Sequence, residues 1–157
     1  MLIKGIVDCD LINYKEACLT IESPKCNFKC DRDCGFKVCQ NSSLAFTKSF
    51  EFSNGKIIEY FDSNPITKAI CFQGLEPLDT FEDLMSFIRL FREKHNDYIV
   101  IYTGYKKEEI KDKIDEIKKF KNIIIKFGRF IPNQKSIYDK VLGVTLSSDN
   151  QYAEVIS

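Results

Sequence analysis

Four cysteines stand close together in the stretch SPKCNFKCDRDCGFKVCQNSSLA. Cys26, Cys30, Cys34 and Cys39 fall within fourteen residues. Thiolates are soft ligands that suit zinc and iron–sulfur clusters. Four thiolates complete a structural zinc site, and a cubane cluster also takes four unless one of its irons stays open to bind another molecule. The spacing therefore predicts a metal centre and leaves both kinds of centre open.

The composition predicts one globular domain over residues 1–157 in a reducing compartment. Apolar residues make up 44% of the chain and charged residues 29%, which is an ordinary soluble profile. Seven cysteines, an odd number, argue against the disulfide framework of a secreted protein. The opening residues MLIKGIVDCD lack the apolar core of a secretory signal. We therefore expect a cytoplasmic protein with reduced thiols.

The charge balance and the lengths of the apolar runs argue against nucleic acids and membranes as partners. Lys plus Arg equals Asp plus Glu, at 23 each, so no net field attracts nucleic acid or a membrane surface. The chain also has no apolar run near the length that spans a bilayer. We expect neither a nucleic-acid partner nor a membrane partner.

The elements that must position the cysteines follow from the apolar pattern. Short apolar runs predict strands at residues 2–8, 17–23, 68–74, 97–104 and 122–127. Helical spacing predicts helices at 55–63, 78–95 and 107–120. The second helix opens with Thr80 and Asp83, which resemble a capping box. Residues 141–157 predict one more strand and an irregular end.

Alternating strands and helices predict parallel pairing through right-handed crossovers. The expected fold class is α/β, either an open, mostly parallel sheet or a partial (β/α) barrel. The cysteine stretch, QGLEPLD at 73–79 and TGY at 103–105 all follow predicted strands. Ligands of such sheets bind at the carboxyl ends of the strands. The three loops are therefore expected to share one rim.

The segment CNFKC resembles the opening of the radical S-adenosylmethionine motif, Cys-x3-Cys-x2-Cys. In that family three thiolates hold a [4Fe–4S] cluster, and the fourth iron chelates the amino and carboxylate groups of S-adenosylmethionine. The family's third cysteine is often followed by one residue and Asn, as in Cys39-Gln40-Asn41. Here DRDCGFKV replaces the usual two residues, so the third ligand is Cys39, with an insertion before it, or Cys34. The Cys-Gln-Asn match favours Cys39 and leaves Cys34 as a spare thiol.

A second resemblance lies in QGLEPLD, which is similar to the family's Gly-Gly-Glu-Pro loop with Leu75 in place of the second glycine. The resemblance implies that Gly74 and Glu76 contact S-adenosylmethionine and that Pro77 shapes the turn. Asn41, after the third cysteine of the motif, joins the same cofactor-binding set.

Three later segments narrow the resemblance to the activating proteins of anaerobic ribonucleotide reductase. They are IVIYTGY, IKFGRFIP and LGVTLSSDNQ. The resemblance places Thr103 and Gly104 at the rim near the ribose and carboxylate, and Gly128 in the loop after the next strand. Lys126 and Arg129 either meet the carboxylate of S-adenosylmethionine or are exposed.

The resemblance implies an enzyme of the radical S-adenosylmethionine type of fold that cleaves its cofactor reductively. The resulting radical installs a glycyl radical on a large partner, the anaerobic ribonucleotide reductase. A flavodoxin-like or other low-potential reductant supplies the electron, and no catalytic residue is needed beyond the cluster ligands. One alternative is a member of the same superfamily that acts on a small molecule. Another is a non-catalytic binding module with zinc held by all four cysteines.

The remaining candidate residues are expected to be structural. His95, the only histidine, is expected to be a solvated surface residue. Cys9, Cys18 and Cys71 lie on or beside predicted strands, where small buried thiols are common.

Overall fold

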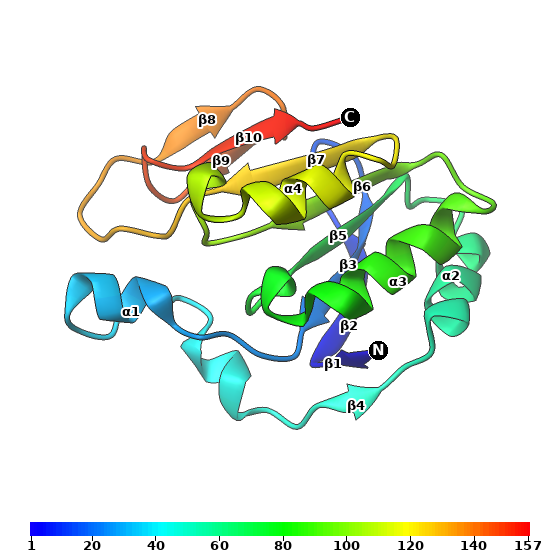
Figure 1. The fold of residues 1–157 in the computed structure, drawn as a ribbon, viewed down its shortest axis with the longest axis horizontal. Helices are drawn as coiled ribbons and strands as arrows, with labels where there is room; N and C mark the ends of the chain where they lie inside the picture. Colours follow the sequence, from blue (N-terminus) through cyan, green and yellow to red (C-terminus); the bar gives the residue numbers. More distant parts are fainter.

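A computed structural model describes all residues, 1–157, and its centre is four parallel strands (Figure 1). They are β3 (Cys18–Ser23), β5 (Ala69–Gly74), β6 (Tyr98–Tyr102) and β7 (Ile123–Phe127), adjacent in that order. The apolar runs of these strands are mostly buried, because both faces of the sheet are covered. The parallel pairing expected for the successive strands is present.

Two antiparallel strands form the edges of this sheet. β2 (Gly5–Asp10) pairs with β3, and β10 (Tyr152–Val155) pairs with β7. The six-stranded sheet has the order β10-β7-β6-β5-β3-β2 and stays open between its two edges. The fold is mixed α/β with a mostly parallel sheet, and its strands do not close into a barrel.

Helices cover one face of the sheet (Figure 1). They are α2 (Asn54–Ser63), α3 (Phe81–Arg92) and α4 (Lys111–Ile117). Because side chains alternate along a strand, Ile70 and Phe72 of β5 point to this face, and Phe72 packs edge-on against Phe87 of α3 at 5.1 Å between ring centroids. The larger of two buried clusters lies here.

A hairpin covers the opposite face. It comprises β8 (Ile137–Asp139) and β9 (Val144–Leu146), and the loop between β2 and β3 lies beside it. Lys15 of that loop donates its backbone N–H to the carbonyl of Leu142 at 2.7 Å. The smaller cluster contains Cys18 and Cys71, which are both fully buried as expected. Cys9, by contrast, is exposed on the edge strand β2, so the expectation of a buried thiol there is wrong.

All three predicted helices are present. The one expected at 55–63 is α2, which begins one residue earlier, and the α-helical parts of the other two are shorter than expected. The expected helix at 78–95 begins as a 3-10 turn (Pro77–Thr80) before α3, and the one at 107–120 is a 3-10 turn (Lys107–Glu109) followed by α4. The capping box is wrong, because the Thr80 hydroxyl donates to the carbonyl of Pro77 at 3.2 Å and makes no cap hydrogen bond. The chain enters α3 directly from the 3-10 turn, which already occupies that hydroxyl.

The cysteine stretch contains structure that the sequence did not predict. α1 (Lys29–Cys34) lies within it, and a 3-10 turn (Ser42–Phe46) follows. α1 has no buried residue, so no apolar periodicity marks it in the sequence. The short strand β1 (Leu2–Ile3) pairs with β4 (Phe50–Glu51) and ties the chain after this stretch to the N-terminus.

His95 is not a solvated surface residue. Its ring stacks on Phe91 with centroids 4.6 Å apart, and its Nε2 lies 3.2 Å from the carboxylate of Asp62. Only 17% of its side chain is exposed. His95 lies beyond the end of α3, but its backbone N–H donates to the carbonyl of Phe91 at 2.9 Å, and this helix-like bond keeps the His95 ring close to the Phe91 ring. No helix in the structure is both long and apolar enough to cross a membrane.

Candidate functional site

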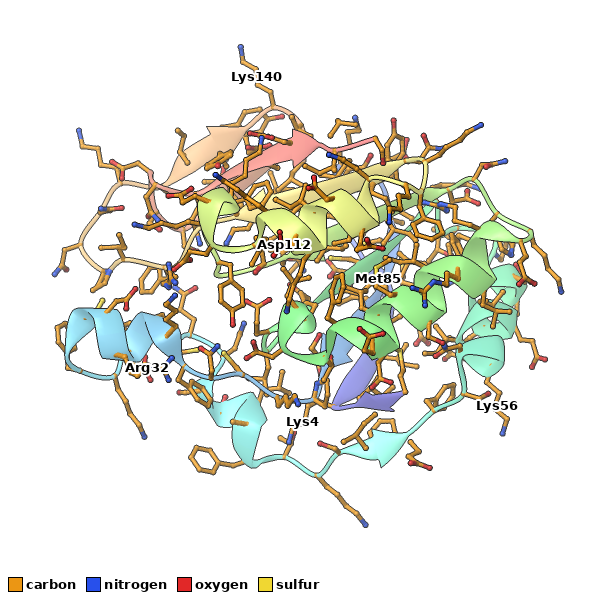
Figure 2. All side chains as sticks on the ribbon, in the orientation of Figure 1. Lys4, Arg32, Lys56, Met85, Asp112 and Lys140 are labelled. Atoms are coloured by element: carbon orange, nitrogen blue, oxygen red, sulfur yellow. The ribbon has the colours of Figure 1, made fainter.

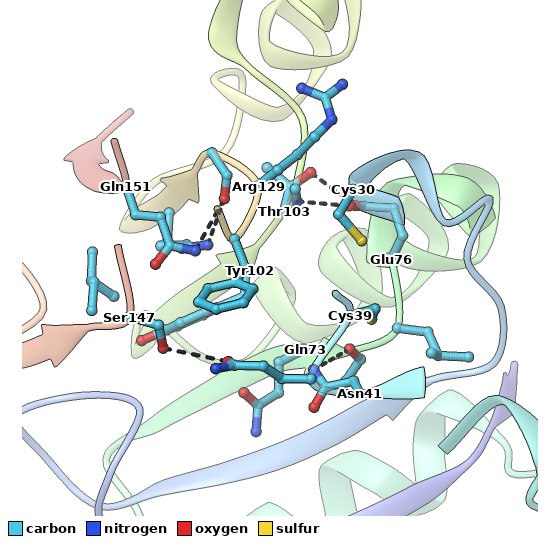
Figure 3. A pocket seen from close by; sticks show the side chains of 18 of the residues that line it. Cys30, Cys39, Asn41, Gln73, Glu76, Tyr102, Thr103, Arg129, Ser147 and Gln151 are labelled. Atoms are coloured by element: carbon cyan, nitrogen blue, oxygen red, sulfur yellow. Dashed lines mark hydrogen bonds between the residues drawn. The ribbon is translucent and has the colours of Figure 1, made fainter. Parts of the chain in front are cut away.

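A cavity of about 300 Å³ lies at the carboxyl ends of the parallel strands, where the three suggestive loops meet (Figure 3). The cysteine stretch, the loop after β5 and the loop after β6 all line it, and β9 and the loop after β7 form other walls. The predicted site residues that line the cavity are Cys26, Cys30, Cys39, Asn41, Gly74, Glu76, Thr103 and Gly104. Pro77 and Cys34 do not line it.

Three half-buried cysteines share the wall of this cavity, and Cys30 lies beside Cys39. Burial raises the pKa of Cys26 to about 11. Burial and the neighbouring Cys39 raise the pKa of Cys30 to about 12. These thiols are therefore protonated at neutral pH unless a bound cation stabilises the thiolates. No group of three His, Cys, Asp or Glu side chains is arranged to hold a single metal ion.

Glu76 binds the three loops to one another. One carboxylate oxygen accepts from the Thr103 hydroxyl at 2.9 Å and the Leu78 N–H at 3.0 Å, and the other accepts from the Gly104 N–H at 2.8 Å. Its own backbone N–H donates to the carbonyl of Lys25 at 2.9 Å. Burial raises the pKa of Glu76 to about 7, although these hydrogen bonds act in the opposite direction. Glu76 is thus a structural hub of the rim.

Asp79 adds a second link between the same loops, which the sequence did not predict. Its carboxylate accepts from the backbone N–H of Asn27 at 2.8 Å and from the Tyr105 hydroxyl at 2.7 Å. The Asn27 side-chain amide also donates to the Tyr105 hydroxyl oxygen at 2.6 Å. Asn27 stands between the first two cysteines, so this network fixes the start of the cysteine stretch. The sequence signal was an aspartate inside QGLEPLD, which had no assigned partner.

Replacing Tyr105 with phenylalanine is expected to lower the free energy of unfolding by about 1–2 kcal/mol, because Asp79 and Asn27 each lose a hydrogen bond. Urea denaturation measures this change. Tyr138→Phe is the matched control, since Tyr138 is 62% exposed. Equal midpoints for the two variants would contradict a role of the network in stability.

Two basic residues at the rim are buried, contrary to one of the two alternatives that the sequence left open. Arg129 is 7% exposed and pairs with Glu109 at 2.7 Å and with Asp33 of α1 at 3.1 Å. Burial opposes the charge of Glu109, but hydrogen bonds from Arg129 and Lys29 lower its pKa to about 2. The guanidinium of Arg129 is therefore already paired with two carboxylates of its own chain.

Lys126 is the other buried cation, at 6% exposure, and it lines the cavity. Its ammonium donates to the carbonyl of Gly128 at 2.9 Å and lies 5.7 Å from the centre of the Tyr102 ring. It makes no salt bridge, so it keeps hydrogen-bond donors for a ligand. Burial lowers its pKa to about 8, while Glu76 acts in the opposite direction.

Comparison with known families decides the class of this site. Residues 19–152 match the family described as "4Fe-4S single cluster domain". The chain belongs to this iron–sulfur family. No curated protein and no solved structure matches the chain. The matched residues include most of β3, all of β5, β6 and β7, the cysteine stretch and the loops after β5, β6 and β7.

The residues present fit such a cluster. Thiolates are its usual ligands, and three thiols share one cavity wall. A cluster is wider than a single ion, so its thiolates need not converge as closely as the ligands of zinc. The four-cysteine zinc site is not assembled, since Cys34 lies outside the cavity.

Proposed function

We propose that this iron–sulfur protein is a radical S-adenosylmethionine enzyme that activates a glycyl-radical partner, the anaerobic ribonucleotide reductase. The observation that carries the proposal is the meeting of CNFKC, Cys39-Gln40-Asn41 and the Glu-Pro loop at one cavity. Each of these segments resembles that superfamily, and nothing in their sequence separation requires them to meet.

The cluster ligands in this proposal are Cys26, Cys30 and Cys39. Three thiolates leave one iron of a cubane open to a further ligand. Cys34 lies outside the cavity and therefore offers no fourth thiolate there. When bound, the cluster supplies one electron to the sulfonium of S-adenosylmethionine, whose S–C5′ bond breaks to give methionine and a 5′-deoxyadenosyl radical.

The chain's own residues bind and orient the cofactor. Gly74 has a φ of +86°, a backbone conformation that favours glycine at this position next to the cavity. The Asn41 side chain donates to the Gly74 carbonyl at 2.7 Å and holds this loop against the cysteine stretch. The ammonium of Lys126 is placed to receive the carboxylate of the cofactor. Thr103 and Gly104 are kept at the rim by Glu76.

The fold supports the same proposal. A mostly parallel sheet with its cavity at the carboxyl ends of the strands is the arrangement expected of the radical S-adenosylmethionine type. Ile12 lines the cavity and is 79% exposed, so the mouth offers an apolar contact to a partner segment. A flavodoxin-like or other low-potential reductant in the cytoplasm completes the proposed system.

Anaerobic reconstitution with iron and sulfide, followed by electron paramagnetic resonance, tests the proposal. We expect about four irons per chain and a reduced cubane signal that changes when S-adenosylmethionine is added. Addition of a glycyl-radical reductase should then produce a glycyl-radical signal and one equivalent of 5′-deoxyadenosine. A cluster signal that does not change when S-adenosylmethionine is added would contradict the proposal. One tightly bound zinc ion without iron would instead favour the non-catalytic zinc-binding module.

A further inference from the structure

The eight residues between Cys30 and Cys39 fold into a closed excursion. α1 carries the chain from Lys29 to Cys34 and ends at Gly35, whose φ of +76° lets the chain reverse. The chain then returns toward the first turn of α1. Because eight residues separate Cys30 from Cys39, a specific contact is needed to bring these two thiols together.

The Asp31 carboxylate makes the contacts that close this excursion. One of its oxygens accepts from two successive backbone N–H groups, those of Val38 and Cys39, each at 2.9 Å. Asp31 directly follows Cys30. The two hydrogen bonds therefore attach the backbone of Cys39 to the residue beside Cys30, and the two thiols become neighbours.

The same contacts separate the two candidates for the third ligand. Cys39 lines the cavity and Cys34 does not, although Cys34 is closer to Cys30 in sequence. Asp33, the other acidic residue of α1, pairs instead with Arg129 at 3.1 Å and takes no part in the closure.

We propose that Asp31 is a positioning residue that presents Cys39, and not Cys34, as the third cluster ligand. The inference rests on the three-thiolate part of the proposed function and needs neither the cofactor nor the partner. In this interpretation the excursion takes the place of the two-residue spacing of the resembling motif. The hydrogen bonds of Asp31 bring Cys30 and Cys39 together, as a two-residue spacing would do.

The experiment uses Cys34→Ala as its background, so that Cys34 cannot replace a displaced ligand. Iron and sulfide are counted after anaerobic reconstitution of Cys34→Ala alone and of Cys34→Ala combined with Asp31→Ala, Asp31→Asn or Asp33→Ala. In Cys34→Ala alone we expect about four irons per chain. Asp31→Ala should lower the count to fewer than about one. Asp31→Asn should restore most of the iron, because an amide oxygen can still accept from both N–H groups.

Asp33→Ala is the matched control on the same helix and should keep the full iron count. Circular dichroism of each variant before reconstitution separates loss of a ligand from loss of the fold. Full iron in the Asp31→Ala combination would overturn the inference. If Cys34→Ala binds about four irons but its cluster signal does not change with S-adenosylmethionine, the proposed function is contradicted and the role of Asp31 is not. The two outcomes differ because the iron count does not depend on S-adenosylmethionine.

Discussion

Replacing Cys39 with alanine is expected to reduce the iron of the reconstituted protein from about four atoms per chain to fewer than about one. Cys39 lies beside Cys30 on the cavity wall, and with Cys26 these are the thiols that line the cavity. Removing one of three ligands leaves two thiolates, too few to retain a cubane against loss to solvent. The iron count and the visible absorbance of the anaerobic protein measure the effect.

Cys34→Ala is the matched control, because Cys34 belongs to the same stretch but does not line the cavity. We expect it to keep the iron count and the change of the cluster signal on addition of S-adenosylmethionine. The reverse pattern, with iron lost in Cys34→Ala and kept in Cys39→Ala, would show that the stretch rearranges when it binds the cluster. Similar melting temperatures of the two apoproteins would exclude unfolding as the cause of either result.

The strands were predictable because burial on both faces of the sheet gives each of them a mostly apolar run in the sequence. Residues 123–127 of β7 are all buried, and this run predicted a strand at 122–127. α1 could not be found in this way, because none of its residues is buried. It is accompanied by the turn at Gly35 and by the hydrogen bonds that Asp31 accepts from Val38 and Cys39. Neither feature appears in a periodic apolar pattern. The pairing of β10 with β7 likewise depends on how the tail returns to the sheet.

The site was partly predictable because parallel strands bring their carboxyl ends together. This rule alone placed the cysteine stretch, Glu76 and Thr103 at one rim. The rule says nothing about which polar groups satisfy each other, so the link from Asp79 to Tyr105 was missed. Glu76 was expected to contact a cofactor, yet the structure shows its carboxylate accepting three hydrogen bonds from its own chain.

The burial of Lys126 was the least predictable feature, because lysine is rarely buried without a partner. A strand that ends at a cavity can hold the ammonium there only at a cost in stability. Burial lowers the pKa of Lys126 from 10.5 to about 8. Below pH 8 the Lys126 side chain of the folded protein is charged in an environment that disfavours the charge. The free energy of unfolding should therefore rise as the pH rises from about 8 toward 10.5, the pKa of lysine in the unfolded chain. Such a cost is typical of residues kept for binding.

Lys126→Met is therefore expected to stabilise the fold and to weaken S-adenosylmethionine binding. Removing the buried charge should raise the free energy of unfolding at neutral pH by about 1–2 kcal/mol, less than the pKa shift alone implies because the bond to Gly128 is also lost. Loss of a charge-assisted hydrogen bond should weaken binding of the cofactor by about ten- to a hundredfold. Urea denaturation and equilibrium dialysis of the reconstituted protein measure the two effects.

The matched control is Lys140→Met, since Lys140 is exposed and projects away from the protein beyond β8 (Figure 2). It should change neither stability nor binding. In the wild-type protein the affinity for the cofactor should also fall as the pH rises through about 8, where the Lys126 ammonium loses its proton, and this part of the pH dependence should be absent in Lys126→Met. A variant that gains stability and binds S-adenosylmethionine as tightly as the wild type would place the carboxylate away from Lys126. A variant that loses stability would instead show that the ammonium holds the loop at Gly128, and its weaker binding would then reflect a displaced rim.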